Sequence, residues 1–270
     1  MINIKNIAPT HINSIIKNRI LLFLSPCDAY LEQVKHFSRK DSFLTLLVII
    51  VIYLSVFLFA PISLAILGVP ADSINLALND NSLLTRHFLY AILPFCIINA
   101  GLIFCLTKLG KHSIGSLGFN FKNTGKSLLF GLALGIIFIL IMLLSGMRYS
   151  TSLRPERDLP MWWLVFSALI TTAFVEELIF RAYIGPRFYA AFNNKFFSIC
   201  VTGIIFAVLH FVPLIAVNGF FVIPLDGIVL YTAIHFVFYW LYSKYNNISG
   251  AILLHFIINF TNNFSISRNM

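Results

Sequence analysis

The stretch Thr171-Thr-Ala-Phe-Val-Glu176-Glu177-Leu-Ile-Phe-Arg181-Ala-Tyr-Ile-Gly185 places three ionisable side chains inside an apolar run. A charged side chain near the centre of a bilayer costs at least about 2.5–3.5 kcal/mol, so such groups face a protein interior or a watery cavity and usually serve function. Glu177 and Arg181 have the i, i+4 spacing of a helical ion pair, whereas Glu176 is turned by about 100° from Glu177. We interpret Glu177 and Arg181 as a structural ion pair and Glu176 as a carboxyl group that faces a cavity. One packing network of all three side chains is an equal alternative.

The composition of the chain indicates a polytopic membrane protein. Hydrophobic residues occupy 59% of the 270 positions and charged residues 11%, whereas soluble domains have about 45–50% and about 25%; the mean hydropathy is +0.89. The net charge of +9 does not indicate nucleic-acid binding, because the Lys and Arg residues lie between apolar runs, as orientation signals do. The four cysteines form no Cys-x-x-Cys pair, so neither a disulfide framework nor a zinc cluster is predicted.

Seven apolar segments approach the length of about 20 residues that a membrane-spanning helix needs. They are residues 43–68, 87–107, 128–147, 161–184, 196–217, 223–243 and 248–264. The sequence therefore predicts an all-α fold, a transmembrane bundle of about seven helices that forms one membrane domain over residues 42–270. Residues 1–41 hold six Lys or Arg and only a short apolar run, which predicts a basic cytoplasmic tail or an interfacial helix.

The distribution of basic residues predicts the orientation. With the N-terminus in the cytoplasm, thirteen Lys and Arg residues fall on the cytoplasmic side and five on the opposite side, as the positive-inside rule requires. The first long apolar segment begins too late for a cleaved signal peptide. We expect a multi-pass protein of a cell membrane, and this pattern suits a bacterial inner membrane.

Polar side chains also occur in three later apolar segments. His210 lies in the fifth segment, and His255 and Asn259 lie four residues apart, hence on one face, in the seventh. His235 in the sixth segment is interpreted as a packing or hydrogen-bonding residue. At about 1.5 Å per residue, Glu176 and His255 lie roughly 10–14 Å inside their segments. The sequence thus predicts one cavity lined by these polar groups, which requires the fourth, fifth and seventh segments to be neighbours.

This set of a carboxylate, two imidazoles and an amide is suited to peptide hydrolysis by a water molecule. Glu176 with His210 can act as a general base toward water. His255 and Asn259 can donate hydrogen bonds to the resulting oxyanion, a contribution of about 3–4 kcal/mol per donor. These motifs hold no Ser or Cys beside a histidine and no His-Glu-x-x-His, so no covalent intermediate is predicted.

Three ordered motifs resemble those of the CPBP family of intramembrane glutamic endopeptidases, which includes CAAX prenyl endopeptidases and bacteriocin-processing or immunity proteins. The motifs are Glu176-Glu177-x-x-x-Arg181, Phe206-x-x-x-His210 and His255-x-x-x-Asn259. The resemblance covers about residues 110–264, a CPBP-like catalytic core, and includes the loop Gly115-Ser-Leu-Gly-Phe119.

The resemblance implies a role for each motif. Glu176 and His210 would activate the water, His255 and Asn259 would form the oxyanion hole, and the ion pair next to Glu176 would support the site. The implied substrate is a membrane-associated protein or peptide, and lipidated proteins are one such class. The implied cut lies near the cytoplasmic membrane face.

Two alternatives stay open at this point. A carboxylate and two histidines can hold zinc with an open position, which would make the chain a zinc-dependent intramembrane protease; apart from this zinc, no cofactor is expected. The second alternative is a non-catalytic bacteriocin-immunity or binding protein of the membrane, because intramembrane charges also mark binding paths.

Overall fold

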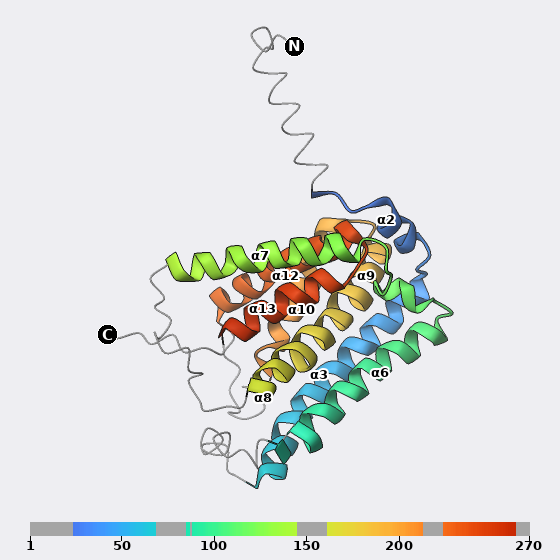
Figure 1. Cartoon of the computed structure of the whole chain (residues 1–270). Helices are drawn as coiled ribbons and strands as arrows, with labels where there is room; N and C mark the ends of the chain where they lie inside the picture. The colour runs from blue at the N-terminus through green and yellow to red at the C-terminus, as the bar shows by residue number, and fades with distance from the viewer. Residues whose placement is uncertain (1–23, 69–84, 87, 145–160, 213–223, 263–270) are drawn as a thin grey trace.

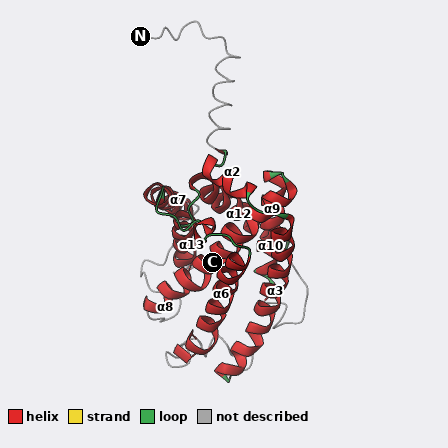
Figure 2. Ribbon diagram, turned by 90° about the vertical axis from the view of Figure 1, so that its right-hand side faces the viewer, coloured by secondary structure: helices red, strands yellow, loops and turns green. Residues whose placement is uncertain are grey.

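The computed structural model describes residues 24–68, 85–86, 88–144, 161–212 and 224–262 of the chain. All regular elements in these ranges are helices (Figure 2), so the predicted all-α class is confirmed. They are α2 (Asp28–Lys35), α3 (Arg39–Leu67), η3 (Phe88–Ile92), α6 (Leu93–Leu109), η4 (Ile114–Leu117), α7 (Thr124–Leu144), α8 (Met161–Phe166), η5 (Ser167–Phe174), η6 (Glu177–Ile184), α9 (Gly185–Phe192), α10 (Lys195–Leu209), α12 (Leu225–Tyr245) and α13 (Ser249–Asn262).

Each of the seven predicted segments coincides with a helix, but their lengths differ from the prediction. Within the described ranges, five helices are long and apolar enough to cross a membrane, namely Lys40–Phe59, Phe88–Leu109, Thr124–Leu144, Met161–Phe192 and Leu225–Tyr245. The helices Lys195–Leu209 and Ser249–Thr261 are apolar but shorter. The predicted continuation of the fifth segment over residues 213–217 and most of the predicted N-terminal tail lie outside the described residues.

The helices around the fourth segment build the frame of the molecule (Figure 1). α10, α12 and α13 pack in succession, and α7 packs along α13. The long helix from α8 to α9 contacts α13 through η5, while its α9 end contacts α3, α10 and α2. This central position of the long helix brings the first motif next to the other two.

Small residues allow α7 and α13 to approach closely. Gly131 of α7 lies against the backbone of Gly250 in α13, and Gly250 lies against the backbone of Ser127. The Ser127 hydroxyl also accepts a hydrogen bond from the Gly250 N–H at 3.0 Å. Close backbone approach through small residues is a common basis of helix association in membranes. The contact fixes the start of α13, and therefore the position of His255 further along that helix.

The first stability prediction concerns this contact. Gly131→Leu is expected to lower the free energy of unfolding by at least about 1–3 kcal/mol, because the added side chain must displace the α13 backbone. Gly125→Leu is the matched control, since a Cβ at Gly125 in the same helix meets nothing within 4 Å. Thermal unfolding of the purified proteins in detergent would compare them. Equal midpoints for the two variants would contradict the proposed role of this contact.

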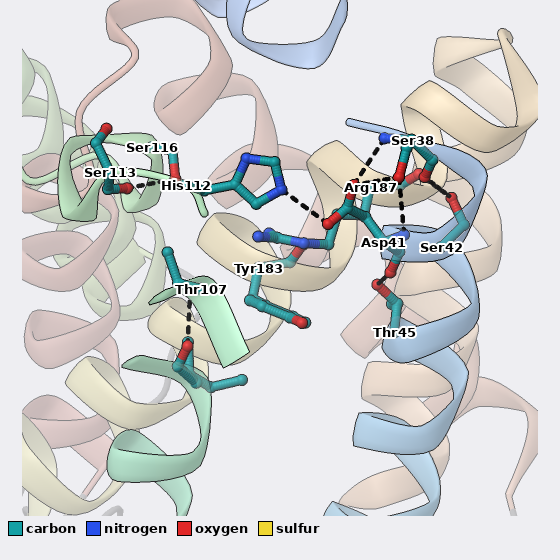
Figure 3. A network of polar contacts seen from close by, with 11 residues as sticks. Ser38, Asp41, Ser42, Thr45, Thr107, His112, Ser113, Ser116, Tyr183 and Arg187 are labelled. Carbon is teal, nitrogen blue, oxygen red and sulfur yellow. Dashed lines mark hydrogen bonds and ion pairs between the residues drawn. The ribbon is translucent and has the colours of Figure 1, made fainter. Parts of the chain in front are cut away.

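A polar network ties α3 to α9 and to the loop after α6 (Figure 3). The Asp41 carboxylate lies 2.7 Å from His112 Nε2 and accepts hydrogen bonds from the backbone N–H and hydroxyl of Ser38 at 2.7 Å each. Beside it, the fully buried Arg187 donates to the Tyr183 carbonyl at 3.0 Å and stacks on the Tyr183 ring, 3.7 Å from its centroid. The Ser42 hydroxyl of α3 donates to the Arg187 carbonyl at 3.2 Å, which ties α3 to the α9 end of the central helix.

Helix α2 is docked on this same end of the bundle. Tyr30 is fully buried, and its hydroxyl is hydrogen-bonded to that of Tyr239. Burial raises the pKa of Tyr30 well above its ordinary value, so the hydroxyl stays neutral at physiological pH. Gln33 donates to the Ser116 carbonyl at 2.7 Å. α2 therefore also anchors the loop that contains Gly115-Ser-Leu-Gly-Phe119.

Candidate active site

The helix that carries the first motif is widened at two places. η5 and η6 are π-helices, and the Gly185 N–H donates to the Phe180 carbonyl five residues earlier. These two stretches therefore depart from regular α-helical hydrogen bonding, whereas Glu176 between them has α-helical dihedral angles. All residues of Glu177–Ile184 are buried, so this widened turn is packed on every side. π-Turns inside membrane or soluble helices are frequent at functional sites.

Glu177 and Arg181 form the predicted ion pair. Glu177 Oε1 lies 3.1 Å from Arg181 Nη1, and both side chains are fully buried. The guanidinium of Arg181 also lies between two aromatic rings, 4.2 Å from the centroid of Phe206 and 4.7 Å from that of Phe238. A buried charge requires such compensation, because removal of one partner leaves the other desolvated and unpaired.

Glu177 has a second partner that the sequence interpretation missed. Its Oε1 lies 2.8 Å from Nδ1 of His255. An ionised carboxylate only accepts hydrogen bonds, so Nδ1 of His255 carries the hydrogen. The His255 ring is stacked on Phe238, with 4.8 Å between centroids. The interpretation of Glu177 as a partner of Arg181 alone is therefore incomplete, because Glu177 also orients an imidazole of the third motif.

Glu176 faces both histidines. Its Oε2 lies 3.8 Å from Nε2 of His210 and 3.8 Å from Nε2 of His255. This oxygen is buried and has no hydrogen-bond partner among the described residues. A distance of 3.8 Å between two polar atoms is one that a water molecule can bridge. The structure thus places Glu176 with the imidazoles, and His255, which faces both carboxylates, links it to the Glu177–Arg181 pair.

His210 is oriented by its own helix and by α12. It follows the last residue of α10, and its Nδ1 lies 2.8 Å from the Phe206 carbonyl. A carbonyl accepts only, so the neutral ring carries its hydrogen on Nδ1 and presents the lone pair of Nε2 toward Glu176. The ring is stacked on Tyr231 with 4.1 Å between centroids and 23° between planes.

Asn259 is held by the central helix. Its Nδ2 donates to Oγ1 of Thr172 in η5 at 2.8 Å. His255 and Asn259 both line the same cavity, as their spacing on one helix face predicts.

A cavity of about 440 Å³ gathers the four predicted residues from three motifs. Its lining includes Glu176, His210, His255, Asn259 and Thr172, together with Leu230, Tyr231, Ile234 and Phe238 of α12. The prediction that the fourth, fifth and seventh segments surround the cavity left out the sixth. α12 packs against both α10 and α13 and supplies one wall of the cavity. A second, mainly apolar cavity of about 300 Å³ reaches Glu176 and His210 from the side of α3 and α6.

The sequence analysis did not single out Thr172 and Tyr231. Thr172 is a polar residue four positions before Glu176, and this spacing was the available signal. Nothing in the local sequence marks Tyr231 as a neighbour of His210. His235, interpreted as a packing or hydrogen-bonding residue, is fully buried and lies 2.9 Å from the Thr202 hydroxyl.

The described part of the chain contains neither a metal-binding cluster nor a disulfide. Over the described residues, no group of three or more His, Cys, Asp or Glu side chains has an arrangement that could hold a metal ion. All four cysteines, Cys27, Cys96, Cys105 and Cys200, are free thiols.

The fold and the site define a helical membrane protein with a carboxylate, two imidazoles and an amide around an internal cavity. Residues 158–261 match the family described as "Type II CAAX prenyl endopeptidase Rce1-like". Searches of curated proteins and of solved structures gave no match. The family match confirms the predicted resemblance to CAAX-type proteases over this segment. It supports an intramembrane endopeptidase whose substrates are membrane-associated proteins.

Proposed function

We propose that the chain is a glutamate-type intramembrane endopeptidase that hydrolyses a peptide bond with an activated water. One observation carries the proposal: the Nε2 atoms of His210 and His255 lie at equal distances of 3.8 Å from the same oxygen of Glu176. A water at this oxygen is within reach of a carboxylate base and of an imidazole acceptor. This arrangement supports general-base activation of a water that bridges these atoms.

In the proposed reaction, the water oxygen forms a bond to the carbonyl carbon of the substrate while Glu176 takes a water proton. His210 orients the water through the lone pair of Nε2. The same proton then passes from Glu176 to the leaving amine as the carbon–nitrogen bond breaks. The second water proton, which the new carboxyl group carries, then passes through Glu176 to the released amine, so the products are a carboxylate and an ammonium and Glu176 is a carboxylate again.

Asn259 and His255 stabilise the oxyanion in this proposal. One Nδ2 hydrogen of Asn259 is used on Thr172, and the second is available to the substrate oxygen. His255 uses Nδ1 on Glu177, so it donates from Nε2 only as an imidazolium. Preorganised donors of this kind act strongly in a site from which water is excluded.

We propose a bacterial inner membrane as the location, with the α2 end of the bundle in the cytoplasm. Basic residues lie at this end: Lys195 donates to the Leu24 carbonyl just before α2, and Lys244 lies in the last turn of α12, next to the Ser243 carbonyl that accepts from the Cys27 N–H. Basic residues on the cytoplasmic side agree with the positive-inside rule. Cleavage would then occur near the cytoplasmic face, and lipidated proteins would be one class of substrate.

The test compares new protein termini in membranes of cells that express the wild type or Glu176→Gln at matched levels. We expect a small set of termini that depends on Glu176, and these termini also identify the substrate and the depth of the cut. No wild-type-dependent termini, together with an intact phenotype in the variant, would favour the immunity or binding alternative. Zinc analysis of the purified active protein tests the other alternative: stoichiometric zinc whose removal abolishes cleavage and whose return restores it would replace the glutamate mechanism.

A further inference from the structure

We propose that Thr172 is a positioning residue, which sets the orientation of the Asn259 amide in the proposed oxyanion hole. The inference rests on the proposed function, because it assigns a task to Thr172 within that same site. Neither the three motifs nor the family match assigns a role to this threonine.

The hydrogen-bond directions around Thr172 follow from its neighbours. Its hydroxyl lies 2.9 Å from the Ala168 carbonyl and 3.3 Å from that of Ser167. Carbonyl oxygens only accept, so the single hydroxyl hydrogen is donated to the helix backbone. The oxygen of Thr172 is then an acceptor toward its remaining neighbour, Nδ2 of Asn259, at 2.8 Å.

This acceptor selects one of the two orientations of the Asn259 amide. With Nδ2 at Thr172, the second Nδ2 hydrogen is available to a substrate oxygen. If the amide turned over, its carbonyl oxygen would face Thr172, and the hydroxyl would have to give up its bond to the Ala168 carbonyl in order to donate to the amide. The bond therefore fixes which edge of the amide each neighbour meets, and it does so before any substrate binds.

The place of Thr172 in the fold supports this task. It lies in the π-helix η5, the part of the central helix that packs against α13. It lines the main cavity and also the smaller apolar cavity on the α3 and α6 side. A side chain at this place can link the helix of Glu176 to the helix of His255 and Asn259 without blocking either cavity.

The test measures how fast the wild-type-dependent termini appear in membranes after expression is induced. Thr172→Val keeps the shape of the side chain but removes the acceptor, and we expect cleavage to slow by about tenfold to a hundredfold, because displaced catalytic groups have effects of this size. Thr172→Ser keeps the hydroxyl and is expected to stay within about threefold of the wild type. Thr107→Val is the matched control: Thr107 is buried, donates to the Ile103 carbonyl at 2.8 Å and lies outside the site.

A double variant tests whether Thr172 acts through Asn259. If it does, Thr172→Val added to Asn259→Ala lowers the cleavage rate no further than Asn259→Ala alone, since coupled residues are not additive. Wild-type rates in Thr172→Val, failure of Thr172→Ser to restore cleavage, or a full additional loss in the double variant would each overturn the inference. Two other results would contradict the proposed function itself: cleavage that persists in Glu176→Gln, or wild-type membranes without new termini. Either result would also contradict the role of Thr172, because that role depends on the proposed function.

Discussion

Glu176→Gln is expected to lower the rate of substrate cleavage by about 10²–10⁴-fold, the usual contribution of a positioned general base. Glutamine has nearly the shape of glutamate, but its amide cannot take a proton from water at neutral pH. The Glu176 carboxylate has no hydrogen-bond partner at Oε2 among the described residues, so the fold is expected to tolerate the change. The measurement is the rate at which the identified substrate loses its intact form in membranes with equal amounts of enzyme.

The control for Glu176→Gln is the same change at Glu32. Glu32 is exposed on α2 and pairs with Lys35 at 2.6 Å, and an exposed pair of this kind contributes little to stability. Glu32→Gln should therefore cleave at the wild-type rate. His210→Ala is expected to lose activity to a similar degree as Glu176→Gln, because the water would lose its orienting imidazole. Full cleavage by both site variants would show that this mechanism is wrong.

Arg181→Met is expected to destabilise the protein by about 3–5 kcal/mol, which is the usual result when one partner of a buried ion pair is removed. The Glu177 carboxylate would stay buried beside His255 without its guanidinium partner, and two aromatic rings would lose the cation between them. Thermal unfolding in detergent measures the change. Arg86→Met is the control, because Arg86 is exposed and exposed substitutions usually change stability by less than about 0.5 kcal/mol.

A double variant separates the structural and catalytic consequences of this pair. Glu177→Gln combined with Arg181→Met removes both charges, so most of the lost stability should return. Cleavage should nevertheless stay low, because an amide is a weaker acceptor than a carboxylate for the Nδ1 hydrogen of His255 and holds the ring less firmly. If the double variant recovered both stability and cleavage, Glu177 would have no role in orienting His255.

The order and approximate position of the helices follow from local information. A spanning helix must satisfy its own backbone hydrogen bonds and present apolar side chains to lipid, so apolar runs in the sequence are sufficient to locate it. All seven predicted segments coincide with helices, although α10 and α13 are shorter than a full span within the described residues. The i, i+4 spacings of Glu177 with Arg181 and of His255 with Asn259 identified residues that the structure places in one site.

By itself, the sequence determined an all-α membrane protein and the candidate residues Glu176, His210, His255 and Asn259, because hydropathy and spacing along one helix are local properties. Only the tertiary structure decided that the central helix is widened into π-turns, that Glu177 bonds His255, and that Tyr231 and Thr172 border the site. These features depend on contacts between residues distant in the chain, such as the 2.8 Å bond of Thr172 to Asn259. The physical reason is that the packing of neighbouring helices selects a hydrogen-bond register and a rotamer, and a local pattern does not specify which helices become neighbours.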